Sequence, residues 1–130
     1  MNAPSTDIKE MLDDDSNVDT TSFVVNIATL DESKINSASI LDYAGRPPQL
    51  TMDRAKYEIP SIQVLVKCVD YEAGWAFISS VVDSLHGRSH EIVNGTYYSL
   101  IECLNGPSFL KRENQRTVFV ANFMVQRRDV

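Results

Sequence analysis

Residues 59–87 read IPSIQVLVKCVDYEAGWAFISSVVDSLHG, and this stretch decides the fold. Its first half places an apolar side chain at every second position: Ile62, Val64, Val66 and Cys68. Side chains two residues apart lie on the same face of a strand. The pattern therefore predicts a strand over residues 60–70, with that apolar face in the core of the protein.

The second half of the stretch predicts an amphipathic helix over residues 71–86. Apolar residues recur there three or four positions apart and form one stripe along a helix: Tyr71, Trp75, Ile78, Val82 and Leu85. Asp70 is expected to cap this helix, and Gly87 is expected to end it in a left-handed conformation. The stripe places Trp75 in the core, where Trp75→Ala should cost about 3–5 kcal/mol.

The flanking sequence predicts a second helix and further strands. Ser, Thr and Asp precede Ile8 and suit a helix start, so a short helix is expected near residues 6–13. β-Branched and aromatic residues predict strands over residues 22–30, 38–43 and 117–125. Asn94-Gly95 lies between two apolar runs and predicts a hairpin turn.

Two segments carry residues that disfavour strand pairing. Gly45, Pro47 and Pro48 follow the second strand, and Gly106-Pro107 follows the hairpin. These residues predict long loops over 44–58 and 105–116. The expected fold is α+β: a mostly antiparallel sheet of about five to six strands, with the N-terminal helix and the main amphipathic helix packed on it.

The 130 residues are expected to form a single domain, residues 1–130, with an unevenly distributed charge. The net charge is −6, and residues 1–32 hold eight of the 18 acidic side chains but only one of the 12 basic ones. Residues 1–20 are therefore interpreted as an acidic N-terminal helix and loop. Without a basic field, the chain is not expected to bind nucleic acid directly, although DNA could pass beside it.

The two cysteines are too few for a disulfide framework, and both are interpreted as small core residues in a reducing compartment, with their pairing left open. The polar, acidic N-terminus does not resemble a signal peptide. The sequence also has no apolar run near the roughly 20 residues that a membrane helix needs. We therefore expect synthesis in the cytoplasm and no membrane partner.

A search for reactive groups yields no predicted catalytic residue, metal ligand or cofactor-binding residue. His86 and His90 are separated by Gly87 and lack a nearby cysteine at a zinc-site spacing. The acidic run Asp13–Asp15 is interpreted as a solvated loop, because it lacks the spacing of a calcium-binding EF-hand. The glycines are scattered, so no phosphate-binding loop or nucleophile elbow is present, and an enzyme is not expected.

The basic residues near the C-terminus are the remaining candidate for function. Residues 111–128 hold five basic side chains and one acidic one. One interpretation is a solvated loop and tail. The other is a head-to-tail contact with the acidic N-terminal part of a neighbouring copy, which closes into a ring if the rotation allows. The candidate interface residues are Asp13, Asp14, Asp15, Arg46, Pro47, Lys111, Arg112, Arg116, Arg127 and Arg128.

Several of these segments, taken in order, resemble the tail terminator family of long-tailed bacteriophages, also called minor capsid or tail completion proteins. The resemblance is carried by the first helix and strand and by residues 40–48, 60–67, 71–73, 84–85 and 120–125. The family often has a Thr-Gly-Gly-like turn after the second strand, where this sequence has Tyr43-Ala44-Gly45. The similarity is one of order and hydrophobicity, without catalytic residues to transfer.

The resemblance implies a structural virion protein that forms a homo-oligomeric ring, a hexamer in this family. Such a ring caps the tail tube, stops its polymerisation and offers a joining surface to the head-side connector while DNA passes through its channel. It lies at the top of the tail, at the head–tail junction. Two alternatives remain: another head–tail connector, such as a stopper or adaptor, or a small cytoplasmic enzyme or ligand-binding domain.

Overall fold

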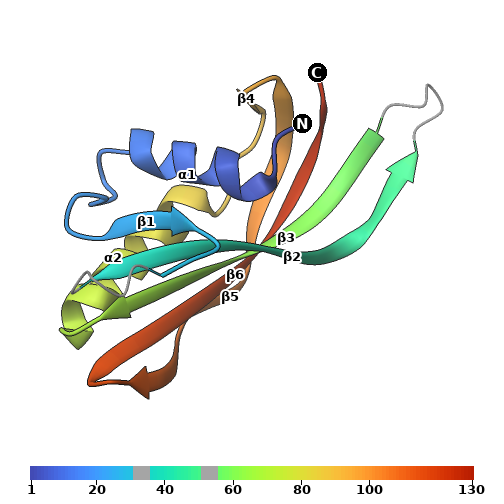
Figure 1. The fold of residues 1–130 in the computed structure, drawn as a ribbon. Helices are drawn as coiled ribbons and strands as arrows, with labels where there is room; N and C mark the ends of the chain where they lie inside the picture. The colour runs from blue at the N-terminus through green and yellow to red at the C-terminus, as the bar shows by residue number, and fades with distance from the viewer. Residues whose placement is uncertain (31–35, 51–55) are drawn as a thin grey trace.

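A computed structural model describes residues 1–30, 36–50 and 56–130. In chain order, the elements are α1 (Pro4–Asp14), β1 (Val24–Ile27), β2 (Ser37–Leu50), β3 (Lys56–Cys68), α2 (Tyr71–Leu85), β4 (Glu91–Val93), β5 (Thr96–Glu113) and β6 (Arg116–Asp129). The helix expected near residues 6–13 and the one expected over 71–86 are thus both present. The two chain termini lie at the same end of the molecule (Figure 1).

Within the described ranges, six strands form one sheet in the order β1-β2-β3-β6-β5-β4. β1 pairs with β2 in parallel, whereas the other neighbouring strands are antiparallel. The sheet is therefore mostly antiparallel, as expected, with one parallel pair of strands at its edge. Ala28 adopts a φ of 65° and ends β1, and its N–H donates to the Ile40 carbonyl at 2.9 Å. The sequence pattern predicted both strands but carried no information on their relative direction.

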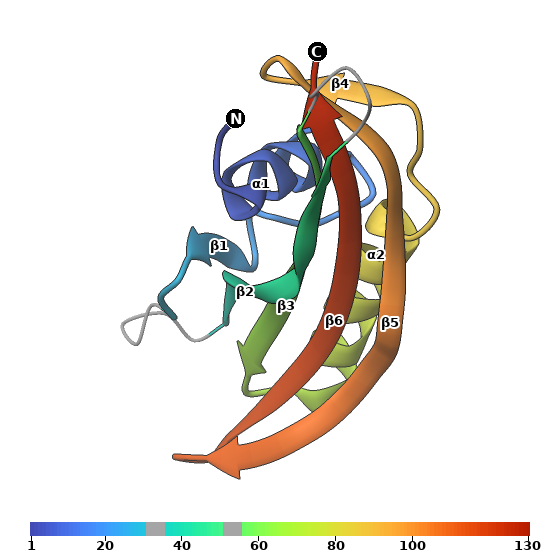
Figure 2. The same ribbon diagram turned by 90° about the vertical axis from the view of Figure 1, so that its right-hand side faces the viewer.

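The core lies between one face of the sheet and the two helices, which cover the same side (Figures 1 and 2). The predicted apolar face of β3 is confirmed, because the side chains of Ile62, Val64, Val66 and Cys68 are almost completely buried. The inward residues of β6 lie beside them: Phe119, Ala121, Phe123 and Val125. The opposite face of β3 and β6 carries no helix in the described part of the chain.

The predicted local signals around α2 and the hairpin are confirmed. The Asp70 side chain accepts a hydrogen bond from the Glu72 N–H at 3.1 Å and caps α2. Gly87 follows the helix with a φ of 86°. Asn94 and Gly95 have φ values of 50° and 76° and form the two-residue turn between β4 and β5, as Asn-Gly hairpin turns require.

The two long loops predicted over 44–58 and 105–116 are wrong for the described residues. β2 continues to Leu50 and β3 begins at Lys56, while residues 51–55 lie outside the described part. β5 continues to Glu113, and only Asn114 and Gln115, both with positive φ, turn the chain into β6. The glycine and proline residues of these two segments are accommodated by register shifts in the β2–β3 and β5–β6 pairings rather than by loops.

The burial predicted for Trp75 is also wrong, since 39% of this residue is exposed. The buried side of α2 is instead formed by Gly74, Phe77, Ile78, Val81 and Leu85. Gly74 sets this orientation: a Cβ atom there would overlap Cys68 Sγ and press on the Phe119 ring. The helix therefore lies close to the sheet along its glycine side, and Trp75 is rotated to the edge of the core.

Candidate assembly surfaces

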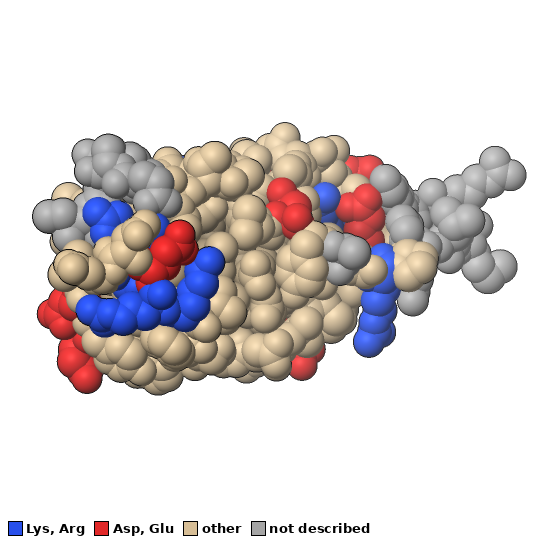
Figure 3. All heavy atoms as spheres, turned by 60° about the horizontal axis from the view of Figure 1, so that its bottom comes forward, with Lys and Arg blue, Asp and Glu red and all other residues tan. Residues whose placement is uncertain are grey.

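The basic residues expected to form one cluster lie at opposite ends of β6. Lys111, Arg112 and Arg116 lie at the end of the β5–β6 hairpin, which we call the arm tip (residues 104–116). Figure 3 shows most of the visible Lys and Arg side chains at one end of the face that comes forward there, beside some Asp and Glu side chains, with mainly uncharged side chains across its middle. Lys111 forms an ion pair with Glu113 at 3.1 Å. The hydrogen bond and charge of Lys111, with the charge of Lys67, lower the pKa of Glu113.

Arg127 and Arg128, at the other end of β6, each contact residues of their own subunit, although Arg128 is exposed. Arg127 is only 5% exposed, and its guanidinium forms an ion pair with Glu58 at 3.0 Å. It also donates to the Asn2 carbonyl at 2.7 Å. Arg128 lies over the Tyr97 ring, 4.8 Å from its centroid. We therefore remove Arg127 from the candidate interface, because its charge is already paired and shielded from solvent.

Arg127 belongs to a buried polar network that the sequence analysis did not find. The Tyr98 hydroxyl donates to Asp7 and accepts from Arg127 Nη1 at 3.5 Å. Asp7 also accepts from the Asn94 side-chain amide at 2.9 Å. Burial, followed by the hydrogen bond to Asp7, raises the pKa of Tyr98. The network joins α1 to β5, β6 and the β4–β5 turn, and no local pattern indicates contacts between residues so far apart in the chain.

The acidic run at the end of α1 is only partly free to meet a partner. Asp13 pairs with Lys9 at 2.8 Å, and Asp15 lies 3.8 Å from an Arg88 nitrogen. A hydrogen bond with Ser84, then the Asn17 N–H and the Arg88 charge, lower the pKa of Asp15. Asp14 is exposed, and no ion pair to it is recorded among the residues that the structure describes.

Asp14 and Asp15 line a groove of about 630 Å³ between α1 and β4, which we call the α1–β4 groove. Its charged lining residues are Glu10, Asp14, Asp15, Arg88 and Glu91. Arg88 is already paired with Glu91 at 3.1 Å, so the groove is acidic overall. Ile92 also lines the groove and is 63% exposed. The groove therefore combines an exposed apolar side chain with a rim of carboxylates.

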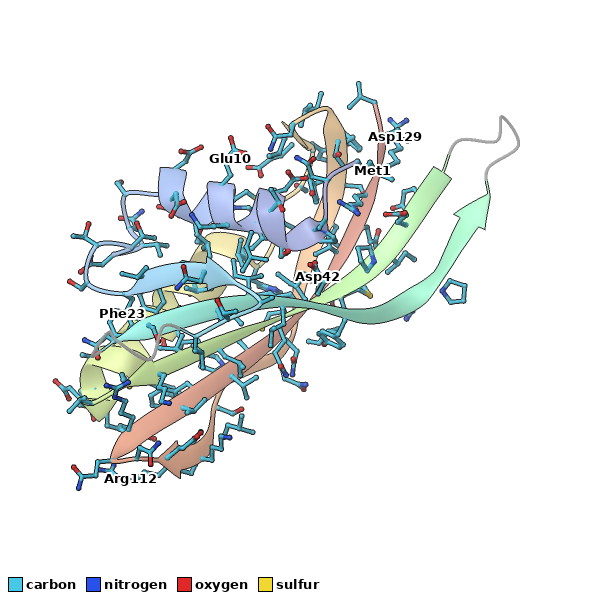
Figure 4. All side chains as sticks on the ribbon, in the orientation of Figure 1. Met1, Glu10, Phe23, Asp42, Arg112 and Asp129 are labelled. Carbon is cyan, nitrogen blue, oxygen red and sulfur yellow. The ribbon has the colours of Figure 1, made fainter. Side chains whose placement is uncertain are left out.

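The remaining two candidate residues, Arg46 and Pro47, are exposed on the projecting part of β2. They lie on the β2–β3 hairpin, which projects from the opposite side of the molecule from the arm tip (Figures 1 and 4). The structure therefore does not gather the ten candidates into one surface. It places them in separate regions: the α1–β4 side, the β2–β3 hairpin, the arm tip and the C-terminal end of β6.

An exposed apolar patch joins the start of α2 to the arm tip. It consists of Tyr71 and Trp75 on α2 and Phe109 on β5, all well exposed, and we call it the aromatic patch. The rings of Tyr71 and Trp75 meet the buried Phe119 ring edge-on, with centroids 5.0 and 5.7 Å away. Phe109 faces the same Phe119 across the β5–β6 ladder. Clusters of exposed aromatic residues next to charged ones are typical of protein-binding surfaces.

No group of His, Cys, Asp and Glu suited to a metal ion occurs among the described residues. His86 Nδ1 accepts from the Cys103 N–H at 3.0 Å, and His90 Nδ1 lies 2.5 Å from the Tyr97 hydroxyl. Cys68 and Cys103 are free thiols, and burial raises the pKa of both. No helix in the described ranges is long and apolar enough to cross a membrane.

Comparisons with known proteins give a similarity in structure but not in sequence. No protein-family model matches the sequence, and no curated protein matches it either. Among solved structures, a chain from the virion of a native gene transfer agent particle has a similar fold, with a TM-score of 0.70. The alignment covers 97% of this chain and 95% of that chain at 11% sequence identity. The similarity therefore extends over nearly the whole of both chains, and at this identity it establishes a shared fold.

Proposed function

We propose that this chain is a structural protein of a phage-like virion, and more specifically a tail terminator. The observation that carries the proposal is the shared fold with a chain of a gene transfer agent virion, which spans nearly all of both chains. In this role, copies of the protein form a ring, a hexamer as in the terminator family, at the head–tail junction. The ring meets the tail tube on one side and the head-side connector on the other, and DNA passes through it.

The distribution of side chains supports an assembly role over catalysis. Tyr98, the residue with the most strongly perturbed pKa among those described, is completely buried. A substrate could enter the α1–β4 groove, but Tyr98 is not one of the residues that line this groove. The exposed features are instead two charged surfaces and an aromatic patch, which suit contacts between proteins. We therefore propose no enzymatic activity, cofactor or metal for this chain.

The length of the tails tests the terminator role. In the phage or particle that encodes this chain, loss of the gene should leave tails of variable and abnormally great length, because nothing stops tube polymerisation. Electron microscopy of lysates measures the length distribution, and the wild-type gene supplied in trans should restore a single length. Tails of normal length that fail to join heads or to retain DNA would instead assign the chain to a stopper or adaptor role.

The oligomeric state of the purified full-length chain provides a second test. A terminator ring should be visible by negative-stain microscopy, and mass measurement should give a multiple of the 14.6 kDa subunit mass. A stable contact between subunits should bury more than about 1,000 Å² in total. A particle that contains this protein at sites other than the head–tail junction would contradict the proposed location.

A further inference from the structure

We propose that the arm tip and the aromatic patch of one copy dock onto the α1–β4 groove of a second copy, in a head-to-tail contact. The inference rests on the proposed function for its biological setting, but it names a specific surface on each side. In this contact the aromatic patch of the first copy packs against the acidic face around Ile92 of the second copy. The basic arm tip of the first copy lies in the α1–β4 groove of the second.

The two surfaces match in charge. The arm tip presents Lys111, Arg112 and Arg116 with a single carboxylate, Glu113. Within the described residues, no carboxylate is recorded as a partner of Arg112 or Arg116. The groove presents four carboxylates against the Arg88 guanidinium, which is already paired. Opposite charges of this kind steer two proteins together and fix their register.

The two surfaces also match in apolar character. Ile92 is 63% exposed although it lies in a strand, and it is surrounded by the acidic residues of the groove. The aromatic patch exposes 53% of Phe109 and 39% of Trp75, next to the basic residues of the arm tip. An apolar centre inside a charged rim is the usual anatomy of a specific protein interface. Here the two rims have opposite signs, so the patch of one copy fits the groove of another.

The placement of the surfaces favours a repeating contact. β4, which carries Ile92, pairs with the first residues of β5, whereas the arm tip lies at the last residues of the same strand. Figure 4 accordingly places Glu10 and Arg112 on opposite sides of the molecule. One chain cannot bring these two surfaces together, because β5 separates them. Different patches at opposite ends of a subunit generate a heterologous contact, which forms a ring when its rotation closes.

Charge reversal on each side tests the contact in the purified full-length chain. The tip variant is Arg112→Glu with Arg116→Glu, and the groove variant is Glu10→Lys with Asp14→Lys. The Glu10 change leaves Asn94 its hydrogen bond to Asp7. Each variant should self-associate at least about tenfold more weakly than the wild type, measured by sedimentation velocity at low salt, because like charges then face each other. An unchanged circular dichroism melting curve checks folding.

Mixing the two variants provides the decisive measurement. The tip of the first variant is acidic and meets the basic groove of the second, while the two unaltered surfaces still match each other. An equimolar mixture should therefore recover association to within about tenfold of the wild type. Asp83→Lys, a charge reversal at an exposed α2 residue outside both surfaces, is the control and should associate normally. Failure of the mixture to recover, or a wild-type chain that stays monomeric, would overturn the contact.

The apolar centre is tested separately with Ile92→Ser. This variant should weaken association at least about tenfold even at high salt, whereas Ile27→Ser, a change at the exposed end of β1, should not.

The tail-length experiment is independent of these measurements. Long tails in the null mutant together with normal association of the reversal variants would reject the contact and retain the terminator role. Normal tails together with weakened variants would reject the role and retain the contact.

Discussion

The Tyr98 hydroxyl donates a hydrogen bond to the Asp7 carboxylate at a site where neither residue is exposed to solvent. Tyr98→Phe removes this donor and leaves the buried carboxylate with fewer partners. We expect it to lower the free energy of unfolding by about 1–3 kcal/mol. Urea denaturation provides the measurement, and Tyr97→Phe, which alters a hydroxyl beside the exposed His90 ring, should have a much smaller effect. Equal stability of the two variants would show that the buried network does not hold α1 on the sheet.

The same tyrosine predicts a loss of stability at alkaline pH. Burial, and then the hydrogen bond to Asp7, raises the pKa of Tyr98 above its ordinary value of 10.0. The folded protein therefore binds this proton more tightly than the unfolded chain. Its contribution is fully present below about pH 10 and is lost as the pH rises further. Urea denaturation between about pH 9 and pH 11 should show a falling free energy of unfolding, with a shallower fall in Tyr98→Phe. Parallel slopes would contradict the assignment.

Gly74 allows α2 to lie against the sheet, so Gly74→Ala should destabilise the protein despite the higher helix propensity of alanine. That propensity favours alanine by about 1 kcal/mol, but the added methyl group would overlap Cys68 Sγ. Overpacking in a core typically costs about 1–3 kcal/mol, and we expect a net loss. Adding Cys68→Ala removes the sulfur, so the effect of Gly74→Ala should shrink in that background. Additive effects in the double-mutant cycle would show that the two residues do not clash.

The sequence predicted those parts of the fold that depend on neighbouring residues. The alternation over Ile62 to Cys68, the Asp70 cap and the Asn94-Gly95 turn are all confirmed. Each of these features is decided within a few positions of the chain. The physical cause and its sequence signature therefore lie in the same short segment, where single-sequence reasoning is strongest.

The loops were predicted from the positions of glycine and proline. Those positions alone do not show which strand edges lack a neighbouring strand. β1 pairs with β2 only as far as Ile40, so the later part of β2 has no strand on that side within the described residues. A proline there loses a donor that no neighbouring strand needs. Gly45 is required for another reason, since a Cβ atom would overlap the Ile59 carbonyl oxygen. At Gly45 the sequence pattern therefore indicated the end of a strand, whereas in the structure β2 continues and approaches β3 closely at this residue.

The candidate site was predicted in composition but not in arrangement. The sequence identified the basic residues near the C-terminus, yet it could not show that Glu58 neutralises Arg127 from 69 positions away. It also missed Ile92 and Phe109 as exposed residues, because an apolar side chain in a predicted strand is normally assigned to the core. Both errors concern contacts between distant segments, which local patterns do not encode.

The exposed edge of α2 changes the predicted cost of removing Trp75. A fully buried tryptophan would make Trp75→Ala cost about 3–5 kcal/mol. Because this residue is 39% exposed and packs mainly on the Phe119 ring, we now expect about 1–2 kcal/mol in the isolated chain. Phe119→Ala, which removes the buried ring itself, should cost at least about 3 kcal/mol in the same denaturation experiment. A larger loss for Trp75→Ala than for Phe119→Ala would contradict the observed packing.

Trp75 is the only tryptophan in the chain, so its fluorescence reports on the aromatic patch alone. In dilute, dissociated protein, acrylamide should quench this fluorescence readily, because the indole lies at the surface. In the head-to-tail contact the neighbouring Ile92 face covers the patch, and the quenching constant should fall at least about twofold as the protein assembles. The Arg112→Glu, Arg116→Glu variant should keep the value of the dissociated protein at the same concentration. Equal quenching of assembled and dissociated wild-type protein would place the aromatic patch outside the subunit contact.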